Sequence, residues 1–331
     1  MTENNKPYLH IKDLKVNFKG YDGTRTILDI DEININKGEA YGIIGESGTG
    51  KTVLALTIFR LLESPPGEII SGKILLDGDD LLKKTQRQME KEVRGKKISM
   101  IFQDPMSTLN PVYTVGKQLI NVISRNQDLK GGDAKNKALE MLSMVELPDA
   151  ERAMDKYPHE LSGGQRQRVI IALALSCGAE FIIADEPTRN LDVTIQAGIL
   201  KLIKNLQRTL NVTVLFIANN PGLISSTCDN TAVLYNGVIV EQGGTKEVLK
   251  NPKHPYTYML LNTVPKNKKD KIDLNKIPQS HEEESCEDSC IYYGKCLKKN
   301  EVCRQAQKNV MVSETHYVKC WLAQEERQEG I

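Results

Sequence analysis

The sequence predicts an α/β fold in which a parallel sheet forms the core and smaller β and helical parts are attached to it. Three short apolar runs carry this prediction, at residues 40–44, 181–184 and 212–217. Short runs that are apolar throughout and contain β-branched residues are typical of strands covered on both faces. Each run lies next to a helical pattern, which is the order that βαβ units require.

The elements outside this core follow in chain order. Apolar and polar residues alternate over residues 9–18, which predicts a half-buried antiparallel strand, and residues 73–78 resemble a second strand that ends in a turn. Residues 112–175 carry mostly helical signals, so we expect a helical part between the first two apolar runs. One face of a further helix is marked by Ile195, Ile199, Leu202 and Leu206.

The character of the chain changes after about residue 250. A short helical stretch is expected at 254–261, and a lysine-rich stretch at 266–276 indicates a solvated linker. A cysteine-containing segment follows. We expect this small C-terminal extension to pack separately from the main domain.

Composition narrows the class of protein. The 331 residues carry 44 basic and 43 acidic side chains, and this balance argues against a protein that binds nucleic acid mainly through phosphates. No run of 18 apolar residues occurs, and residues 1–6 are polar without a hydrophobic signal region. We therefore expect a cytosolic protein, which at a membrane would act as a peripheral subunit.

A glycine-rich loop stands between the apolar run at 40–44 and an apolar helical pattern at 53–56. It is a P-loop with the sequence Gly45-Glu46-Ser47-Gly48-Thr49-Gly50-Lys51-Thr52. The backbone N–H groups of such a loop turn inward around the β- and γ-phosphates, and the helix N-terminus favours an anion. Lys51 adds a point charge, and the hydroxyl of Thr52 can ligate Mg²⁺. We predict nucleotide binding here.

Two carboxylates end the strand predicted at 181–184, which is the Walker B pattern. We expect Asp185 to hold Mg²⁺ through water, and Glu186 to polarise the attacking water as a general base. The alternative interpretation is a pair of solvated acids at the end of a strand.

A second glycine-rich turn, Leu161-Ser162-Gly163-Gly164-Gln165, opens the helical pattern at 166–175. Its glycines allow close backbone approach, and its helix N-terminus can face a phosphate. Together with the P-loop and residues 184–188, it resembles the signature of ABC-type ATPases. The resemblance implies that two chains clamp ATP between the P-loop of one and Ser162, Gly163, Gly164 and Gln165 of the other. A plain glycine turn before a helix is the alternative.

The same resemblance implies further site residues. Gln103 stands in the Q-loop, which in the family touches Mg²⁺ and the transmembrane subunits, and Asp192 matches the D-loop aspartate. In the family an aromatic residue from the N-terminal sheet stacks on adenine. Phe18 or Tyr21 could do this, although Phe18 could equally belong to the core.

Segments 103–111, 157–160, 192–197 and 254–257 are similar to the oligopeptide/dipeptide branch of the family. The similarity covers nearly the whole chain. It implies an ATPase subunit at the cytoplasmic face of a membrane that imports oligopeptides, dipeptides or a related solute such as a nickel chelate. The implied partners are a second ATPase subunit, two transmembrane permease subunits and, through them, an extracellular solute-binding protein.

The resemblance also predicts how the chain is divided. We expect an ABC ATPase domain at residues 7–250, in which a helical subdomain occupies about residues 104–175. A C-terminal extension of the oligopeptide-transporter type is expected at residues 251–331.

The chain departs from the family in two places. Asn219 stands where members carry a switch histidine, and no histidine occurs between His159 and His254. An amide forms hydrogen bonds but cannot become cationic. Arg189-Asn190 replaces the small residues that usually precede the D-loop aspartate. We interpret both changes as a weakened hydrolytic site in one half of a heterodimer. The alternative interpretation of these two changes is tolerated drift. The alternatives to import as the function are a regulatory ATP-binding subunit with negligible turnover and a soluble ABC ATPase outside transport.

Five of the seven cysteines lie in the C-terminal segment. Because disulfides are rare in reducing compartments, metal binding is the favoured interpretation. Cys290, Cys296, Cys303 and Cys320 resemble the cysteine motif of this transporter branch, and four thiolates suit an iron-sulfur cluster or zinc. We favour a 4Fe-4S cluster because the C-x2-C knuckles of zinc ribbons are absent, with zinc or free thiols as alternatives. Cys286 fits no position of the motif.

Overall fold

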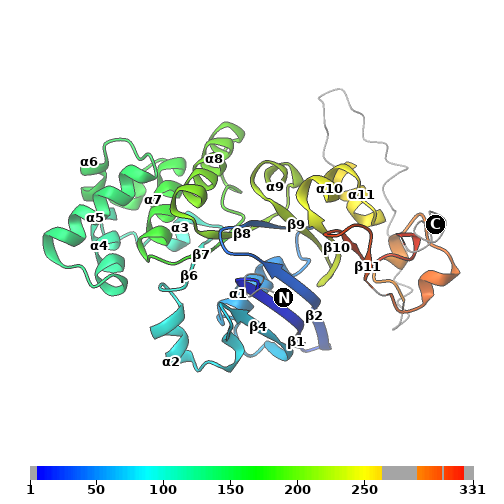
Figure 1. Cartoon of the computed structure of the whole chain (residues 1–331). Helices are drawn as coiled ribbons and strands as arrows, with labels where there is room; N and C mark the ends of the chain where they lie inside the picture. Colours follow the sequence, from blue (N-terminus) through cyan, green and yellow to red (C-terminus); the bar gives the residue numbers. More distant parts are fainter. Residues whose placement is uncertain (1–5, 263–288, 308, 324–331) are drawn as a thin grey trace.

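The computed structural model describes residues 6–262, 289–307 and 309–323 of the chain (Figure 1). Their strands form a central sheet of eight strands and an antiparallel sheet of four strands. Among these residues, no helix combines the length and the apolar character that a membrane span requires.

The central sheet contains the three apolar runs. Its strand order is β11-β12-β10-β9-β3-β8-β7-β6. The strands span Ala40–Ile44 (β3), Ile98–Ile101 (β6), Phe181–Asp185 (β7), Thr213–Ala218 (β8), Asn230–Tyr235 (β9), Val238–Gly244 (β10), Val310–Met311 (β11) and Tyr317–Val318 (β12). Strands β6, β7, β8, β3 and β9 are parallel, whereas β10, β12 and β11 extend one edge in antiparallel pairs. The predicted parallel core is confirmed.

Both faces of the central sheet are covered, which explains the apolar runs. Phe181 and Ile183 of β7 pack toward the four-stranded sheet, whereas Ile182 and Ala184 pack with the helices of the opposite face. Successive residues of a strand point to opposite faces. A strand that is covered on both sides is therefore apolar at every position.

The four-stranded sheet has the order β2-β1-β4-β5. Its strands span Leu9–Gly20 (β1), Gly23–Ile35 (β2), Gly67–Leu76 (β4) and Asp79–Asp80 (β5). The strand predicted at 9–18 is confirmed within β1, and the one predicted at 73–78 is the end of the longer β4. Helix α1 packs between this sheet and the central sheet through Leu54 and Ile58 (Figure 1).

Helix α2 lies on the same side of the central sheet as the four-stranded sheet, and the remaining helices cover the opposite face or extend beyond the β6 edge (Figure 1). The helices span Lys51–Ile58 (α1), Gln86–Gln88 (α2), Pro105–Thr108 (α3), Val115–Asn126 (α4), Gly131–Met144 (α5), Ala150–Asp155 (α6), Gly163–Ser176 (α7), Val193–Leu210 (α8), Pro221–Thr227 (α9), Thr245–Lys250 (α10) and Pro255–Asn262 (α11). Single 3₁₀ or π turns occur at Leu81–Lys83, Met89–Val93, Pro158–Glu160, Tyr293–Lys295 and Glu301–Arg304. Helices α4 to α7 pack on one another and form the expected helical part.

The C-terminal segment packs onto the main domain, so the expectation of separate packing is wrong. Strand β12 pairs with β10 and places Val318 opposite Glu241. The buried carboxylate of Glu241 accepts hydrogen bonds from the backbone N–H groups of Lys253 (2.8 Å) and His254 (3.0 Å) and lies 2.8 Å from Nε2 of His316. A free strand edge and a buried charge both require partners, and residues C-terminal to β10 supply them.

Candidate functional site

The P-loop connects β3 to α1, and its shape depends on glycine. Gly50 has φ +102°, a backbone conformation that L side chains rarely adopt. A Cβ atom at Gly45 would overlap the carbonyl oxygen of Leu234 in the neighbouring strand β9. The strand, the loop and the helix that the sequence predicts are therefore present in the predicted order.

Lys51 is buried at the start of α1, and its ammonium group lies over the loop. Its Nζ donates hydrogen bonds to the carbonyl oxygens of Gly45 (3.0 Å) and Glu46 (2.7 Å). Burial lowers the pKa of Lys51, while the nearby charges of Glu186 and Asp185 oppose this shift. A phosphate group in the loop would offer this ammonium a stronger, anionic acceptor.

Asp185 ends β7 beside the P-loop helix and is 2% exposed. Burial raises its pKa, and a hydrogen bond with the side chain of Thr52 opposes the rise. Its Oδ1 is buried and has no hydrogen-bond partner among the described residues. A carboxylate oxygen without a partner, next to a hydroxyl, is a donor set that suits Mg²⁺.

The carboxylate of Glu186 is held from two sides. Its Oε1 accepts a hydrogen bond from Nδ2 of Asn219 at 2.5 Å, and its Oε2 lies 3.2 Å from Nη1 of Arg189. Asn219 follows β8, whose parallel pairing with β7 brings the two strand ends together. Asn219 thus lies beside the predicted general base, and its own Oδ1 is buried with no partner among the described residues.

Gln103 follows β6, and Arg189 connects it to Glu186. With its amide oxygen turned toward the guanidinium, Gln103 accepts hydrogen bonds from Nε (3.3 Å) and Nη1 (2.5 Å) of Arg189. The sequence marked Arg189 as a departure from the family but gave it no place in the site. Arg189 lies three residues after Glu186, and this short spacing is the feature of the sequence that could have indicated a contact between them.

The signature and the D-loop lie side by side. Ser162 caps α7, since its Oγ accepts from the N–H of Gln165 (3.3 Å) while the Gln165 Oε1 accepts from the N–H of Ser162 (3.0 Å). Asp192 caps α8 by accepting from the N–H of Ile195 at 3.0 Å. A Cβ atom built on Gly164 would lie 3.0 Å from the side chain of Ile195, and that of Gly163 3.4 Å from Leu191. The two helix N-termini therefore form one surface.

The two candidates for adenine stacking have different environments. Phe18 is partly buried and packs against the core between the sheets. Tyr21 lies in the turn between β1 and β2 with its ring fully exposed. Only Tyr21 presents a free ring face.

Tyr256 is a site residue that the sequence did not reveal. Its hydroxyl accepts a hydrogen bond from the backbone N–H of Glu46 in the P-loop at 3.0 Å. Its buried ring packs against Tyr235 (centroids 4.5 Å apart) and Tyr292 (5.5 Å). Tyr292 belongs to the cysteine segment, so this aromatic bridge connects that segment to the P-loop. In the sequence, residues 254–257 indicate only the transporter branch.

The four predicted cysteine ligands are neighbours. Cys290, Cys303 and Cys320 are buried, Cys296 is half-buried, and the N–H of Cys290 donates to the carbonyl of Cys303 at 2.9 Å. Burial raises the pKa of Cys290 and Cys296 and brings that of Cys320 to about 11, and the neighbouring thiolates add to each rise.

No set of three or more His, Cys, Asp or Glu side chains within the described ranges is arranged to hold a metal ion. The metal therefore stays a prediction. Cys286, the fifth cysteine of the C-terminal cluster, lies outside the described residues.

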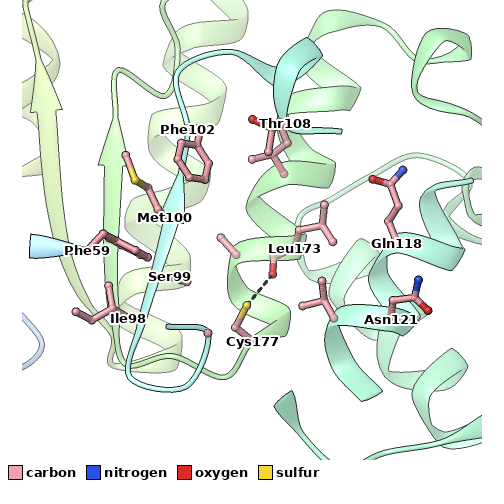
Figure 2. Close-up of a pocket in the computed structure, with 14 residues that line it drawn as sticks. Phe59, Ile98, Ser99, Met100, Phe102, Thr108, Gln118, Asn121, Leu173 and Cys177 are labelled. Carbon is pink, nitrogen blue, oxygen red and sulfur yellow. Dashed lines mark hydrogen bonds between the residues drawn. The ribbon is translucent and has the colours of Figure 1, made fainter. Parts of the chain in front are cut away.

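A groove of about 430 Å³ lies between β6, α4 and α7 (Figure 2). Phe102 borders it next to Gln103, and Thr108, Gln118 and Asn121 line its helical side. Cys177 borders it from α7, and burial raises the pKa of that thiol to about 11. The groove thus adjoins the Q-loop.

Comparisons with known proteins agree with this arrangement. Residues 28–189 match the family model "ABC transporter", and residues 240–303 match "Oligopeptide/dipeptide transporter, C-terminal region". The oligopeptide transport ATP-binding protein OppD of Bacillus subtilis is 40% identical over 95% of this chain and 88% of its own length. The probable D,D-dipeptide transport ATP-binding protein DdpD of Escherichia coli is 38% identical over 97% and 98%.

Solved structures give the same result. The ATP-binding cassette MJ0796, in a dimeric post-hydrolysis state bound to ADP and Pi, has a TM-score of 0.64 and 26% identity, and covers 72% of this chain and 98% of its own. The cbiO1 protein of Clostridium perfringens, part of the complex cbiONQ, has a TM-score of 0.64 and 28% identity, with 75% and 92% coverage.

Proposed function

This chain belongs to the ABC transporter family of ATPases, and we propose that it energises the import of oligopeptides or dipeptides. The observation that carries the proposal is the shared site of Lys51, Asp185 and Glu186, on a chain that also has the C-terminal region of the peptide-transporter branch. The domain division proposed is 7–250 for the ATPase and 251–331 for the extension.

We assign roles to the site residues as follows. Lys51 and the P-loop N–H groups bind the phosphates, and the ring of Tyr21 stacks on adenine. Thr52, Asp185 and Gln103 hold Mg²⁺, which when bound screens the phosphate charge. The unpartnered Oδ1 of Asp185 supports this assignment.

Hydrolysis needs a water that is oriented and deprotonated. We assign this role to Glu186, whose carboxylate accepts one hydrogen bond from Asn219. The signature and the D-loop are assigned to contact the ATP that is bound to a second chain. Their surface is formed by two helix N-termini, which favour an anion. The residues are Ser162, Gly163, Gly164, Gln165 and Asp192.

The partners proposed are a second ATPase subunit, two permease subunits and an extracellular solute-binding protein that acts through them. The chain would be peripheral, at the cytoplasmic face of the membrane. We assign the groove beside Gln103 to contact with a permease, since it adjoins the Q-loop.

We propose that this chain's own site is the weaker of two in a heterodimer. Asn219 lacks the charge that a switch histidine can carry. Glu186→Gln is then expected to reduce the ATPase rate of the assembled transporter by about twofold, whereas the equivalent change in the partner removes nearly all of it. Equal losses from both changes would show two equivalent sites and support the drift alternative.

The cysteine cluster is proposed to hold a 4Fe-4S cluster. The thiols of Cys290, Cys296 and Cys320 each have a pKa that neighbouring cysteines help to raise, and a thiolate set of this kind gains most from a bound cation. One zinc ion and no iron in anaerobically purified protein would decide for the zinc alternative.

The import function is tested by purifying the chain from membranes with its permeases. ATPase activity that rises on addition of a peptide and its binding protein is the expected result. Activity that no peptide stimulates, with no permease in the preparation, would contradict the proposal and favour a regulatory or soluble ABC ATPase.

A further inference from the structure

Arg189 lies beside Glu186 in the candidate site, with its side chain 50% exposed. Its guanidinium forms an ion pair with Oε2 of Glu186 at 3.2 Å, and its backbone N–H donates to the carbonyl of Glu186 at 3.2 Å. Its charge also reaches the ammonium of Lys51, where it opposes the charges of the two Walker B acids. The positive charge of Arg189 therefore acts on the same groups that are proposed to bind the phosphates and Mg²⁺.

Both oxygens of Glu186 are engaged when Arg189 is in this position. Asn219 donates to one oxygen and Arg189 pairs with the other, and the Glu186 side chain is only 12% exposed. A general base needs an oxygen directed at the attacking water. The Arg189 guanidinium occupies the oxygen that Asn219 leaves free, so an attacking water has to displace it to reach Glu186.

The same guanidinium connects Glu186 to the Q-loop. Gln103 accepts from its Nε and Nη1, while Nη1 also faces Glu186. A planar guanidinium has five donors in a fixed fork, so one arginine can hold two loops at once. Movement of the Q-loop would therefore move the partner of the general base.

We propose that Arg189 is a positioning residue that holds Glu186 in a closed ion pair and ties it to Gln103. This inference rests on the proposed ATPase function and specifies its regulation. Turnover at this site is slow while the ion pair is closed. It rises when the Q-loop draws Arg189 away from the carboxylate.

The test uses the assembled transporter in which the corresponding glutamate of the partner chain has been changed to glutamine, so that only this site turns over. Arg189→Ser is expected to raise kcat about five- to tenfold, while KM for ATP stays within about twofold. Arg189→Lys keeps the charge but cannot bridge two loops, so a smaller rise is expected. Arg208→Ser, on the exposed end of α8, removes the same charge elsewhere and is expected to change neither constant.

Coupling to the Q-loop is tested by a double-mutant cycle. Gln103→Ala also removes a proposed Mg²⁺ ligand and is expected to lower kcat by itself, so the cycle compares the rise that Arg189→Ser causes with and without Gln103. A smaller rise in the Gln103→Ala background is expected, because that change has already broken the link. An unchanged or lower kcat in Arg189→Ser would overturn the inference, and a lower kcat would show that Arg189 stabilises the transition state. If Arg189→Ser fails to assemble, Arg189→Lys is measured instead, and an unchanged or lower kcat in that variant would overturn the inference. Absence of ATP binding that depends on Lys51 would instead overturn the proposed function itself.

Discussion

The nucleotide site and the C-terminal cysteine segment both place ionisable groups in buried positions, but they are built differently. In the nucleotide site, one loop between β3 and α1 and the ends of two adjacent parallel strands supply Lys51, Asp185 and Asn219. In the cysteine segment, the buried thiols come from separate turns and from the residues after β12, and the main sheet provides their support.

The two regions obtain their stability from different sources. The P-loop is formed by its own glycines and a helix N-terminus. The cysteine segment is too short to bury a core of its own, so Tyr292 and Cys290 join the core that covers the central sheet. The aromatic bridge through Tyr256 makes the two regions dependent on each other.

The variant with the largest expected effect changes the nucleotide site and leaves the cysteine segment intact. Lys51→Ala removes the P-loop cation, and we expect ATP affinity to fall by about 100-fold or more, since the charge-assisted contact of the ammonium with the phosphates is lost. Titration with a fluorescent ATP analogue measures this. Lys201→Ala, at an exposed position of α8, is the matched control. Equal affinity in Lys51→Ala and the control would contradict the assignment of the site.

The next change breaks the cysteine segment. Cys303→Ser keeps a group that can bond to Oδ1 of Asn300, which the thiol contacts at 3.1 Å, but loses a ligand. We expect loss of iron and roughly tenfold faster proteolysis of the segment, because bound metal stabilises a fold of this size. Metal analysis and limited trypsin digestion measure both, with Cys177→Ser as control. Full iron content in Cys303→Ser would rule out Cys303 as a ligand.

A third change concerns pH. Burial lowers the pKa of His254 to about 4, and its Nδ1 already accepts from the N–H of Tyr256 at 3.1 Å. The unfolded chain therefore binds a proton near pH 6.5 that the folded chain does not. We expect about 2 kcal/mol of stability, present above pH 6.5, to be lost as the pH falls to about 4.5.

Urea unfolding at each pH measures this loss. In His254→Asn the amide oxygen can still accept from the N–H two residues on, and the pH dependence is expected to become shallower. The same slope in both proteins would show that other groups cause the acid sensitivity.

The last variant tests the aromatic bridge between the nucleotide site and the cysteine segment, and its expected effect is small. Tyr256→Phe leaves the N–H of Glu46 without its acceptor, which costs about 1 kcal/mol. We expect ATP affinity to fall about fivefold as the P-loop loosens. Tyr258→Phe removes the same hydroxyl from an exposed position of α11 and is expected to change nothing. Identical affinities in the two variants would show that the P-loop does not depend on Tyr256.

The sequence by itself determined the parallel core and the phosphate loop. Apolar character at every position of residues 181–184 requires cover on both faces, and the glycines of the P-loop are local requirements of its backbone. Both features are encoded in short stretches of consecutive residues, so they can be inferred from the sequence.

Tertiary structure decided the contacts among residues that are distant in sequence. The sequence could not show that Asn219 holds one oxygen of Glu186, because that depends on how β7 and β8 pair. Nor could it show that Tyr256 joins the P-loop to the cysteine segment. Aromatic packing and buried hydrogen bonds join side chains by their positions in space, and the spacing of residues along a chain does not encode those positions.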